Sequence, residues 1–386
     1  MEIILEMGST SNINYRCKHF KGNSPCDFHK IHQVQCNNCT FNELIKTRIL
    51  IIKVGSIGDV LRTTGLLKPI KEKYPSSHIT WITAESAIPF FNNIDLVDSV
   101  KPHDNLFTFL YLKMTKFDVS INLDAEIESS MLMALAHSEK KLGYEYLKDG
   151  HVYPCNQEAT DWFHMGLSDI LKKANRKTYQ QIMLEICQLN TNLSTKPLIN
   201  KNDNENQLTE QFKKQLHITE DTFVIGLNTG AGERWPLKKW TIENYIGLIR
   251  KLDDSKYKTK VILYGGPEEK ERNTEIQRRI SSDIINSGCS NSIRKEIALL
   301  DATDILVTGD TLLMHVGIAL DKHIILILGP TSYYEIDLFG NGQKIVSEMN
   351  CLCCYKSDCD KDVNCMNSIS VDTVYNHIAN YLEHLV

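Results

Sequence analysis

Two glycine-bearing stretches of this chain contain residue types that could hold an anionic ligand. One runs from Gly55 to Asp59, and the other runs from Gly309 to His315 with the pair Asp310-Thr311 near its start. Each follows an apolar run and precedes a helical pattern, so each puts an aspartate at a helix start. The free N–H groups and the dipole of such a helix end favour a phosphate. The simpler interpretation of either aspartate is a helix cap.

A third stretch, 228–240, adds positive charge to this pattern. Gly230 and Gly232 would let its backbone approach a ligand closely. Lysine is a compact point charge that suits a diphosphate. The basic residues of the stretch are Arg234, Lys238 and Lys239. With the helix start at Thr311, this loop predicts a diphosphate site, and the simpler alternative is a solvated basic loop.

Two glutamates follow another predicted strand and are candidates for binding a sugar. Glu268 and Glu269 come directly after the turn 265–267, which reads Gly-Gly-Pro. A carboxylate at the end of a parallel strand can accept hydrogen bonds from ribose hydroxyls. Either glutamate could instead favour the first turn of the next helix through the helix dipole.

The elements that position these loops are strands and helices that alternate along the chain, which predicts parallel doubly wound sheets. Strands are expected at 48–54, 78–83, 117–124, 223–228, 260–264, 305–307 and 324–328. Helices are expected at 60–73, 127–137, 162–173, 178–189, 242–252, 268–280, 292–300, 310–320 and 371–386.

This alternation occurs twice, on either side of a polar segment at 190–206 that reads as an interdomain linker. The predicted fold class is therefore α/β, with two doubly wound domains facing a central cleft, which is a preferred place for a ligand. The expected units are a cysteine-rich appendage at 1–47, an N-terminal domain at 48–200, a second domain at 220–350, and a cysteine-rich segment with a terminal helix at 351–386.

Composition excludes several classes of function. The net charge of −5 gives no electrostatic footprint for DNA or RNA. No apolar run is long enough to span a membrane, and residues 1–6 lack the basic start and apolar core of a signal peptide. We therefore expect a cytoplasmic protein, and peripheral contact with the inner face of a membrane stays open.

The cysteines gather at the two ends of the chain, where nine of the twelve lie. In a reducing compartment, clustered thiolates bind metal more often than they form disulfides. The candidate ligand sets are Cys17, Cys26, Cys36 and Cys39 at one end, and Cys351, Cys354, Cys359 and Cys365 at the other. Each set contains one C-x-x-C pair and predicts a structural zinc or iron ion. Packed or free cysteine is the alternative.

Taken together, the stretches 53–64, 230–240 and 309–315 resemble, in order and spacing, three signatures of glycosyltransferase family 9, the ADP-heptose heptosyltransferases. The resemblance covers roughly residues 48–350. It implies the GT-B fold, in which two Rossmann-like domains face each other and the second binds the sugar nucleotide. It also implies an inverting transfer that needs no catalytic metal ion or other cofactor, and a terminal helix that crosses back to the N-terminal domain.

The resemblance implies roles for individual residues as well. Asp59 matches the general base of the family, and Lys238 matches its phosphate-contacting lysine. The matching donor-binding residues are Asp310 and Thr311, then Leu312 and Leu313 through their backbone, and His315. The further donor-binding candidates are Gly58, Thr229, Gly230, Arg234 and Glu268.

The sequence departs from the family pattern at two places. Leu312 stands where many members have glycine, and Pro267 displaces the family's acid, so that Glu268 is its substitute. Both places concern the details of donor recognition.

The main hypothesis is therefore a transferase that moves heptose or a related sugar from ADP-heptose to an acceptor hydroxyl, in lipopolysaccharide or another glycan. The acceptor could be a glycan, a lipid-linked molecule or a protein. Two alternatives use the same cleft: a sugar-nucleotide epimerase of the GT-B kind, and a non-catalytic scaffold that binds a sugar nucleotide.

Overall fold

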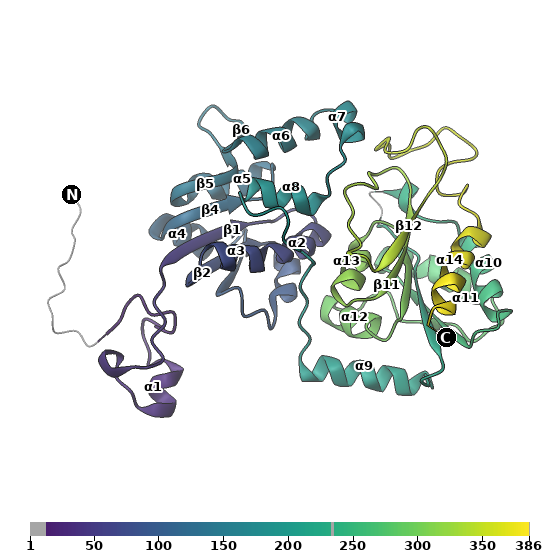
Figure 1. Ribbon diagram of the computed structural model, residues 1–386, viewed down its shortest axis with the longest axis horizontal. Coiled ribbons are helices and arrows are strands. Elements are labelled where there is room, and N and C mark those ends of the chain that lie inside the picture. Colours follow the sequence, from purple (N-terminus) through teal and green to yellow (C-terminus); the bar gives the residue numbers. More distant parts are fainter. Residues whose placement is uncertain (1–12, 233–234, 386) are drawn as a thin grey trace.

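The structure of the chain is a computed structural model that describes residues 13–232 and 235–385. Two α/β domains lie side by side, and a small appendage extends from the first of them (Figure 1). Within the appendage are α1 (Asp27–His32) and the short tight helix η1 (Cys36–Asn38). Aromatic rings pack this segment, with Phe28 stacked on Phe41 at 4.5 Å between ring centroids.

The first domain is built around β1 (Thr47–Ile52), whose last four residues are fully buried. A run of buried aliphatic residues on both faces is what a central parallel strand requires. The sheet order is β3-β2-β1-β4-β5-β6, and β6 is the antiparallel member. Its elements are β1, α2 (Ile57–Thr63), η2 (Thr64–Leu66), α3 (Leu67–Lys73), β2 (Ser77–Thr83), η3 (Glu85–Phe91), β3 (Ser99–Pro102), α4 (Leu106–Met114), β4 (Lys116–Asn122), α5 (Ile127–Leu135), β5 (His137–Tyr146), β6 (Val152–Pro154), α6 (Gln157–Gly166), α7 (Asp169–Ala174) and α8 (Tyr179–Ile186).

The second domain has a parallel sheet in the order β12-β11-β10-β7-β8-β9. Its elements are α9 (Asp203–Gln215), β7 (Phe223–Asn228), η4 (Pro236–Lys238), α10 (Ile242–Asp253), β8 (Thr259–Tyr264), η5 (Pro267–Glu269), α11 (Lys270–Arg278), β9 (Ile285–Asn286), α12 (Ile293–Leu300), β10 (Ile305–Thr308), α13 (Leu312–Ala319), β11 (His323–Leu328), β12 (Gly342–Val346) and α14 (Val371–Glu383). Each strand and helix predicted in this half has a counterpart, although the last residue of the helix predicted at 371–386 lies outside the described residues. Elements α9, β9 and β12 were not predicted.

The two sheets share one topology, which fixes where a ligand can bind. If β7 is taken as the first strand of its domain, the order of the second sheet read from β9 to β12 is the same as the order of the first sheet read from β3 to β6. In such a sheet the strand order reverses direction at one point, and a crevice opens there at the carboxyl ends of the strands. That point lies between β1 and β4 in the first domain and between β7 and β10 in the second.

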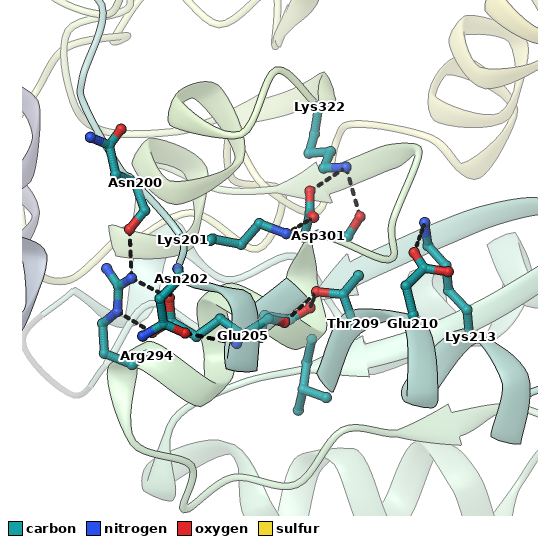
Figure 2. Close-up of polar contacts among 12 residues, drawn as sticks. Asn200, Lys201, Asn202, Glu205, Thr209, Glu210, Lys213, Arg294, Asp301 and Lys322 are labelled. Atoms are coloured by element: carbon teal, nitrogen blue, oxygen red, sulfur yellow. Dashed lines mark hydrogen bonds and ion pairs between the residues drawn. The ribbon is translucent and has the colours of Figure 1, made fainter. Parts of the chain in front are cut away.

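The linker is shorter than the predicted segment 190–206, because the last residues of that segment already belong to the second domain. Helix α9 packs on α12, where the Thr209 hydroxyl donates to the Ala298 carbonyl oxygen at 2.9 Å. Arg294 of α12 donates from Nε to Glu205 at 2.6 Å, and Lys201 pairs with Asp301. Figure 2 shows these contacts along the start of α9. The predicted domain start at residue 220 is therefore too late.

The terminal helix does not cross back to the first domain, so that prediction is wrong. The side chains of Val374, Ile378 and Leu382 on α14 are fully buried in the core of the second domain, against α10 and β11. A side-chain hydrogen bond from Trp240 Nε1 to the Ile369 carbonyl oxygen, 3.0 Å long, holds the chain that enters α14. Figure 1 shows α14 beside α10, on the outer side of the second sheet.

Among the residues that the structure describes, no helix has the length and apolar character needed to cross a membrane.

The packing of α14 gives a first prediction. Ile378→Ala should lower the free energy of unfolding by about 2–5 kcal/mol, because the residue is fully buried and its removal leaves a cavity. Hydrogen exchange should become faster in α10 and β11 and stay unchanged in α2 and α3. The control is Asn376→Ala, at an exposed position of the same helix. Faster exchange in α2 rather than α10 would contradict this packing.

Candidate functional site

A cavity of about 920 Å³ lies between the two domains, at the carboxyl ends of β1, β7, β8 and β10. Loops from both halves of the chain line it. The predicted site residues on its wall are Gly58, Asp59, Gly230, Lys238, Glu268, Asp310, Thr311, Leu312, Leu313 and His315. Residues that lie more than two hundred positions apart in the sequence thus share one space. Arg234 lies outside the described residues.

Asp59 faces this cavity from the first domain, on the first turn of α2. Its Oδ1 pairs with Arg62 Nε at 3.0 Å, and 34% of its side chain is exposed. The Arg62 guanidinium lies over the Tyr179 ring, 3.3 Å from the centroid. Burial raises the pKa of Asp59, but the nearby cations Arg62 and Lys53 outweigh burial, and the net pKa is below the usual value. Asp59 is therefore ionised at neutral pH, and it does not act as a side-chain cap of α2.

A buried ion pair beneath the loop holds Asp59 in place. Lys53 pairs with Asp124, and both side chains are almost fully buried. The other carboxylate oxygen of Asp124 accepts hydrogen bonds from the backbone N–H groups of Val54, at 2.6 Å, and Gly55, at 2.8 Å. These bonds tie the loop after β1 to the end of β4. The sequence pattern placed Asp124 only at a strand end and gave Lys53 no role.

Lys238 and Asp310 form the corresponding ion pair in the second domain. Lys238 Nζ lies 2.5 Å from Asp310 Oδ2, and the Thr331 hydroxyl donates to the same oxygen at 3.1 Å. Burial raises the pKa of Asp310, but the charge and hydrogen bond of Lys238 more than reverse this and lower the pKa to about 2. Asp310 thus orients Lys238 and is not a helix cap, contrary to the simpler interpretation of its position.

The start of α13 keeps its backbone N–H groups free of any side-chain cap. Thr311 occupies the capping position, but its hydroxyl accepts a hydrogen bond from Asn228 Nδ2 at 2.8 Å instead. Leu312 and Leu313, which carry the first N–H groups of the helix, are part of the cavity wall, and Thr311 does not cap these groups with its side chain. Such a helix end, beside a lysine, has the charge and the donors that an anion needs. Asn228 was not singled out by the sequence.

His315 and Gly58 join the two domains at the base of the cavity. A Cβ on Gly58 would lie 3.2 Å from His315 Cδ2 and 3.6 Å from Leu312 Cα. Burial lowers the pKa of His315 to about 4, with a further contribution from Arg62, so the imidazole is neutral at pH 7. Its buried Nδ1 has no hydrogen-bond partner among the described residues.

The two glutamates after β8 have different roles. Glu269 is buried, its Oε1 pairs with Lys239 at 2.9 Å, and its Oε2 accepts from the Gly266 N–H at 3.0 Å. Both glutamates line the cavity, but Glu268 is the exposed one. Of the two candidates, Glu268 is thus the one whose carboxylate is open to a ligand.

Thr229 is the predicted site residue whose side chain does not line the cavity. Its hydroxyl donates to Asn273 Oδ1 at 2.5 Å behind the wall. The next residue must be glycine, because a Cβ on Gly230 would lie 2.1 Å from Glu269 Cδ. Thr229 therefore supports the loop and does not reach the ligand space.

Sequence reasoning missed part of the wall that follows β11. Glu335 and Tyr355 both line the cavity, and the Tyr355 hydroxyl donates to Glu335 Oε1 at 3.2 Å. Burial raises the pKa of Glu335, although Arg62 across the cavity lowers it in part. The segment that carries both residues has no regular pattern, so only their proximity in the fold reveals them.

The predicted metal sites are not supported. The N-terminal set, Cys17, Cys26, Cys36 and Cys39, lines a cavity of about 370 Å³ in the appendage. In the C-terminal set, burial raises the pKa of the Cys365 thiol to about 11, and the neighbouring thiols Cys354, Cys351 and Cys359 add to this effect. Yet over residues 13–232 and 235–385, no three His, Cys, Asp or Glu side chains are arranged to hold a metal ion. The C-terminal thiols have other partners: Lys361 Nζ donates to Cys351 at 3.6 Å, and Cys365 is buried in the core of the second domain.

Comparisons with known proteins identify the family and the fold of this chain. Residues 109–365 match the family described as glycosyltransferase family 9 (heptosyltransferase). The chain is 22% identical over 311 residues to lipopolysaccharide heptosyltransferase 2 of Salmonella typhimurium, covering 74% of this chain and 83% of that protein.

Two solved structures have the same fold. A family 9 glycosyltransferase from Veillonella parvula is 18% identical, with a TM-score of 0.71 over 89% of this chain and 99% of that one. The ADP-heptose lipopolysaccharide heptosyltransferase II of E. coli is also 18% identical, with a TM-score of 0.65 over 88% of this chain and 99% of that one. The predicted fold class, two Rossmann-like domains in a GT-B arrangement, is confirmed.

The burial of His315 gives a prediction about pH. Its imidazole should titrate near pH 4, which NMR can follow through the Cε1–H resonance. Because the unfolded chain takes up this proton near pH 6.5, the free energy of unfolding should fall as the pH drops from 6.5 to 4. The loss is on the order of 3 kcal/mol over the full range.

His315→Gln should lack this component, so the difference in stability between wild type and variant should shrink as the pH falls. The matched control is His217→Gln, which removes an exposed imidazole. A His315 resonance that titrates near pH 6.5 would contradict the buried, neutral ring.

Proposed function

This chain belongs to glycosyltransferase family 9, the heptosyltransferases, and from that premise we propose that it transfers heptose or a related sugar from ADP-heptose to an acceptor hydroxyl, with inversion at the anomeric carbon. The observation that carries the proposal is the shared cavity: an ionised acid of the first domain faces it together with an anion site of the second. An in-line displacement of a nucleotide needs a general base on one side of the reacting carbon and a binding site for the leaving diphosphate on the other.

The donor is proposed to lie along the second domain. Its diphosphate would occupy the start of α13, where Lys238 Nζ and the N–H groups of Leu312 and Leu313 meet. Glu268 would accept hydrogen bonds from the ribose hydroxyls, since Glu269 is already paired with Lys239. The anomeric carbon would then point towards the first domain and Asp59.

In the proposed reaction, Asp59 accepts the proton of the acceptor hydroxyl while the hydroxyl oxygen forms a bond to the anomeric carbon. The bond from that carbon to the donor phosphate oxygen breaks, and its electron pair leaves with ADP. Lys238 and the α13 N–H groups stabilise the charge that develops on the diphosphate. Both groups are oriented before the donor arrives, Lys238 by Asp310 and the helix end by Asn228.

The acceptor is proposed to enter from the first-domain side of the cavity. Ser56, Ile57 and Arg62 line this side, and Glu335 with Tyr355 face it from the second domain. The wall thus offers both charges and hydroxyl partners, which suits a polyhydroxylated glycan or a phosphorylated sugar better than an apolar molecule.

Acceptor-dependent release of ADP tests the proposed transfer. With ADP-heptose and truncated lipopolysaccharide cores that lack heptose, the protein should release ADP and extend the core by one heptose, as mass spectrometry would show. Without an acceptor, ADP release should stay at background. Epimerised donor in the absence of acceptor would favour the epimerase alternative, and donor binding with no product in either case would favour a scaffold.

Substitution of the proposed base tests the mechanism. Asp59→Asn keeps the shape of the side chain but cannot accept the proton, so kcat should fall about 10²–10⁴-fold. The Kd for ADP should change less than about threefold, because Lys238 and α13 are untouched. Asp95→Asn, at an exposed position of the same domain, is the matched control. Transfer by Asp59→Asn at the wild-type rate would show that Asp59 only neutralises Arg62.

A further inference from the structure

The cavity continues beyond the proposed diphosphate and ribose positions, towards the edge of the second sheet. Strands β10, β7, β8 and β9 are neighbours in that order, and the loop after each one reaches the cavity wall. Three strand spacings of about 4.8 Å give about 14 Å from the start of α13 to the loop after β9. That span suits an extended nucleoside diphosphate, with its base at the β9 end.

Glu296 of α12 lies on the wall at this far end and has an incomplete set of hydrogen bonds. It is 8% exposed, and its Oε2 accepts from Asn291 Nδ2 at 2.7 Å. Its buried Oε1 has no hydrogen-bond partner in the described part of the chain. Leaving a buried carboxylate oxygen without a donor is costly, so such an atom in a ligand cavity indicates a donor supplied by the ligand.

The surroundings of Glu296 fit a flat base with a polar edge. Ile293 and Cys289 line the same end of the cavity and offer weakly polar surface. Burial raises the pKa of Glu296 to about 7, even though Asn291 and Lys295 lower it. No ion pair to this carboxylate occurs among the described residues.

We infer that Glu296 Oε1 accepts a hydrogen bond from the exocyclic amino group of the donor's nucleobase, which makes Glu296 a specificity-determining residue for an amino-bearing base such as adenine. This inference rests on the proposed function, because it takes the cavity to be the nucleoside diphosphate site. A base without an amino group leaves Oε1 unpaired and binds more weakly. Glu296 selects the base and takes no part in the transfer step.

The Asn291 contact makes Glu296→Gln a sharp test. Asn291 Nδ2 is a donor, so the new amide must turn its oxygen towards Asn291 and its NH₂ group into the place of Oε1. The substitution therefore replaces an acceptor by a donor without changing the size of the side chain. The amino group of the nucleobase, a donor, would then face the NH₂ group of the new glutamine, also a donor, and no hydrogen bond could form between them.

The experiment compares ADP with purine riboside 5′-diphosphate, which lacks only the amino group, by isothermal titration calorimetry. At pH 8.5, where Glu296 is ionised, wild type should bind ADP about tenfold or more tightly than the amino-free ligand, as expected for a hydrogen bond to a charged group. In Glu296→Gln, ADP should lose about tenfold in affinity, while the amino-free ligand should keep its wild-type Kd. Glu271→Gln, an exposed glutamate of α11, should leave both values unchanged.

The amino-free ligand also reports whether the variant is folded. Equal wild-type binding of the two ligands, or an equal loss of both in Glu296→Gln, would overturn the role of Glu296 and leave the proposed transferase intact. If wild type binds neither ligand, the proposed nucleoside diphosphate site fails and this inference fails with it.

Discussion

The close approach of α2 and α13 at Gly58 is the contact on which the rest of the site depends. A Cβ on Gly58 would lie 3.2 Å from His315 Cδ2, which is closer than an ordinary van der Waals contact. The next residue, Asp59, is thereby held over the same cavity as the start of α13. A larger side chain at position 58 would push the two helices apart, and with them the acid and the anion site.

Three acids around this contact each have their own cation. Asp124 is paired with Lys53, Asp59 with Arg62, and Asp310 with Lys238. Burying charges is costly unless they are paired, so this arrangement allows several ionised groups in one enclosed space. It also orients them before any ligand binds, and groups that need no reorganisation stabilise developing charge well. Lys238 is shared: an incoming diphosphate and Asp310 would both contact it.

Much of the fold could be predicted from the sequence, because its central strands carry uninterrupted aliphatic runs. The loops that follow β1, β7 and β10 could be predicted for the same reason, since glycine and acidic residues stand directly after those runs. Strand β5 (His137–Tyr146) was missed, because its polar first half resembles a loop and the helix before it was extended to residue 137. Helix α4 was missed for a different reason. Its sequence is apolar on all sides, including positions that are exposed, so the sequence shows no helical periodicity.

The site was predictable where a residue follows a strand, and less so where its role depends on a partner distant in the sequence. Glu268 and Glu269 are indistinguishable locally, and only the ion pair with Lys239 separates them. Arg62 and Glu335 face each other across the cavity from different domains, which no local pattern reveals. The position of α14 likewise could not be predicted locally, because it depends on an apolar surface formed by α10 and β11, which are distant in the sequence.

The chain between the domains has an anchor on each side of a very short segment. The Leu198 N–H donates to the Thr64 hydroxyl of the first domain at 2.8 Å, whereas the Asn200 carbonyl oxygen accepts from Arg294 of the second at 2.7 Å. Only Ile199 lies between these two attachments. Other contacts overlap with these two attachments: the Asn200 amide also donates to the Asn93 carbonyl oxygen of the first domain at 2.6 Å, and Lys196 pairs with Asp321 of the second domain. The connecting segment is therefore held by both domains at once, so a movement of one lobe against the other has to break some of these contacts.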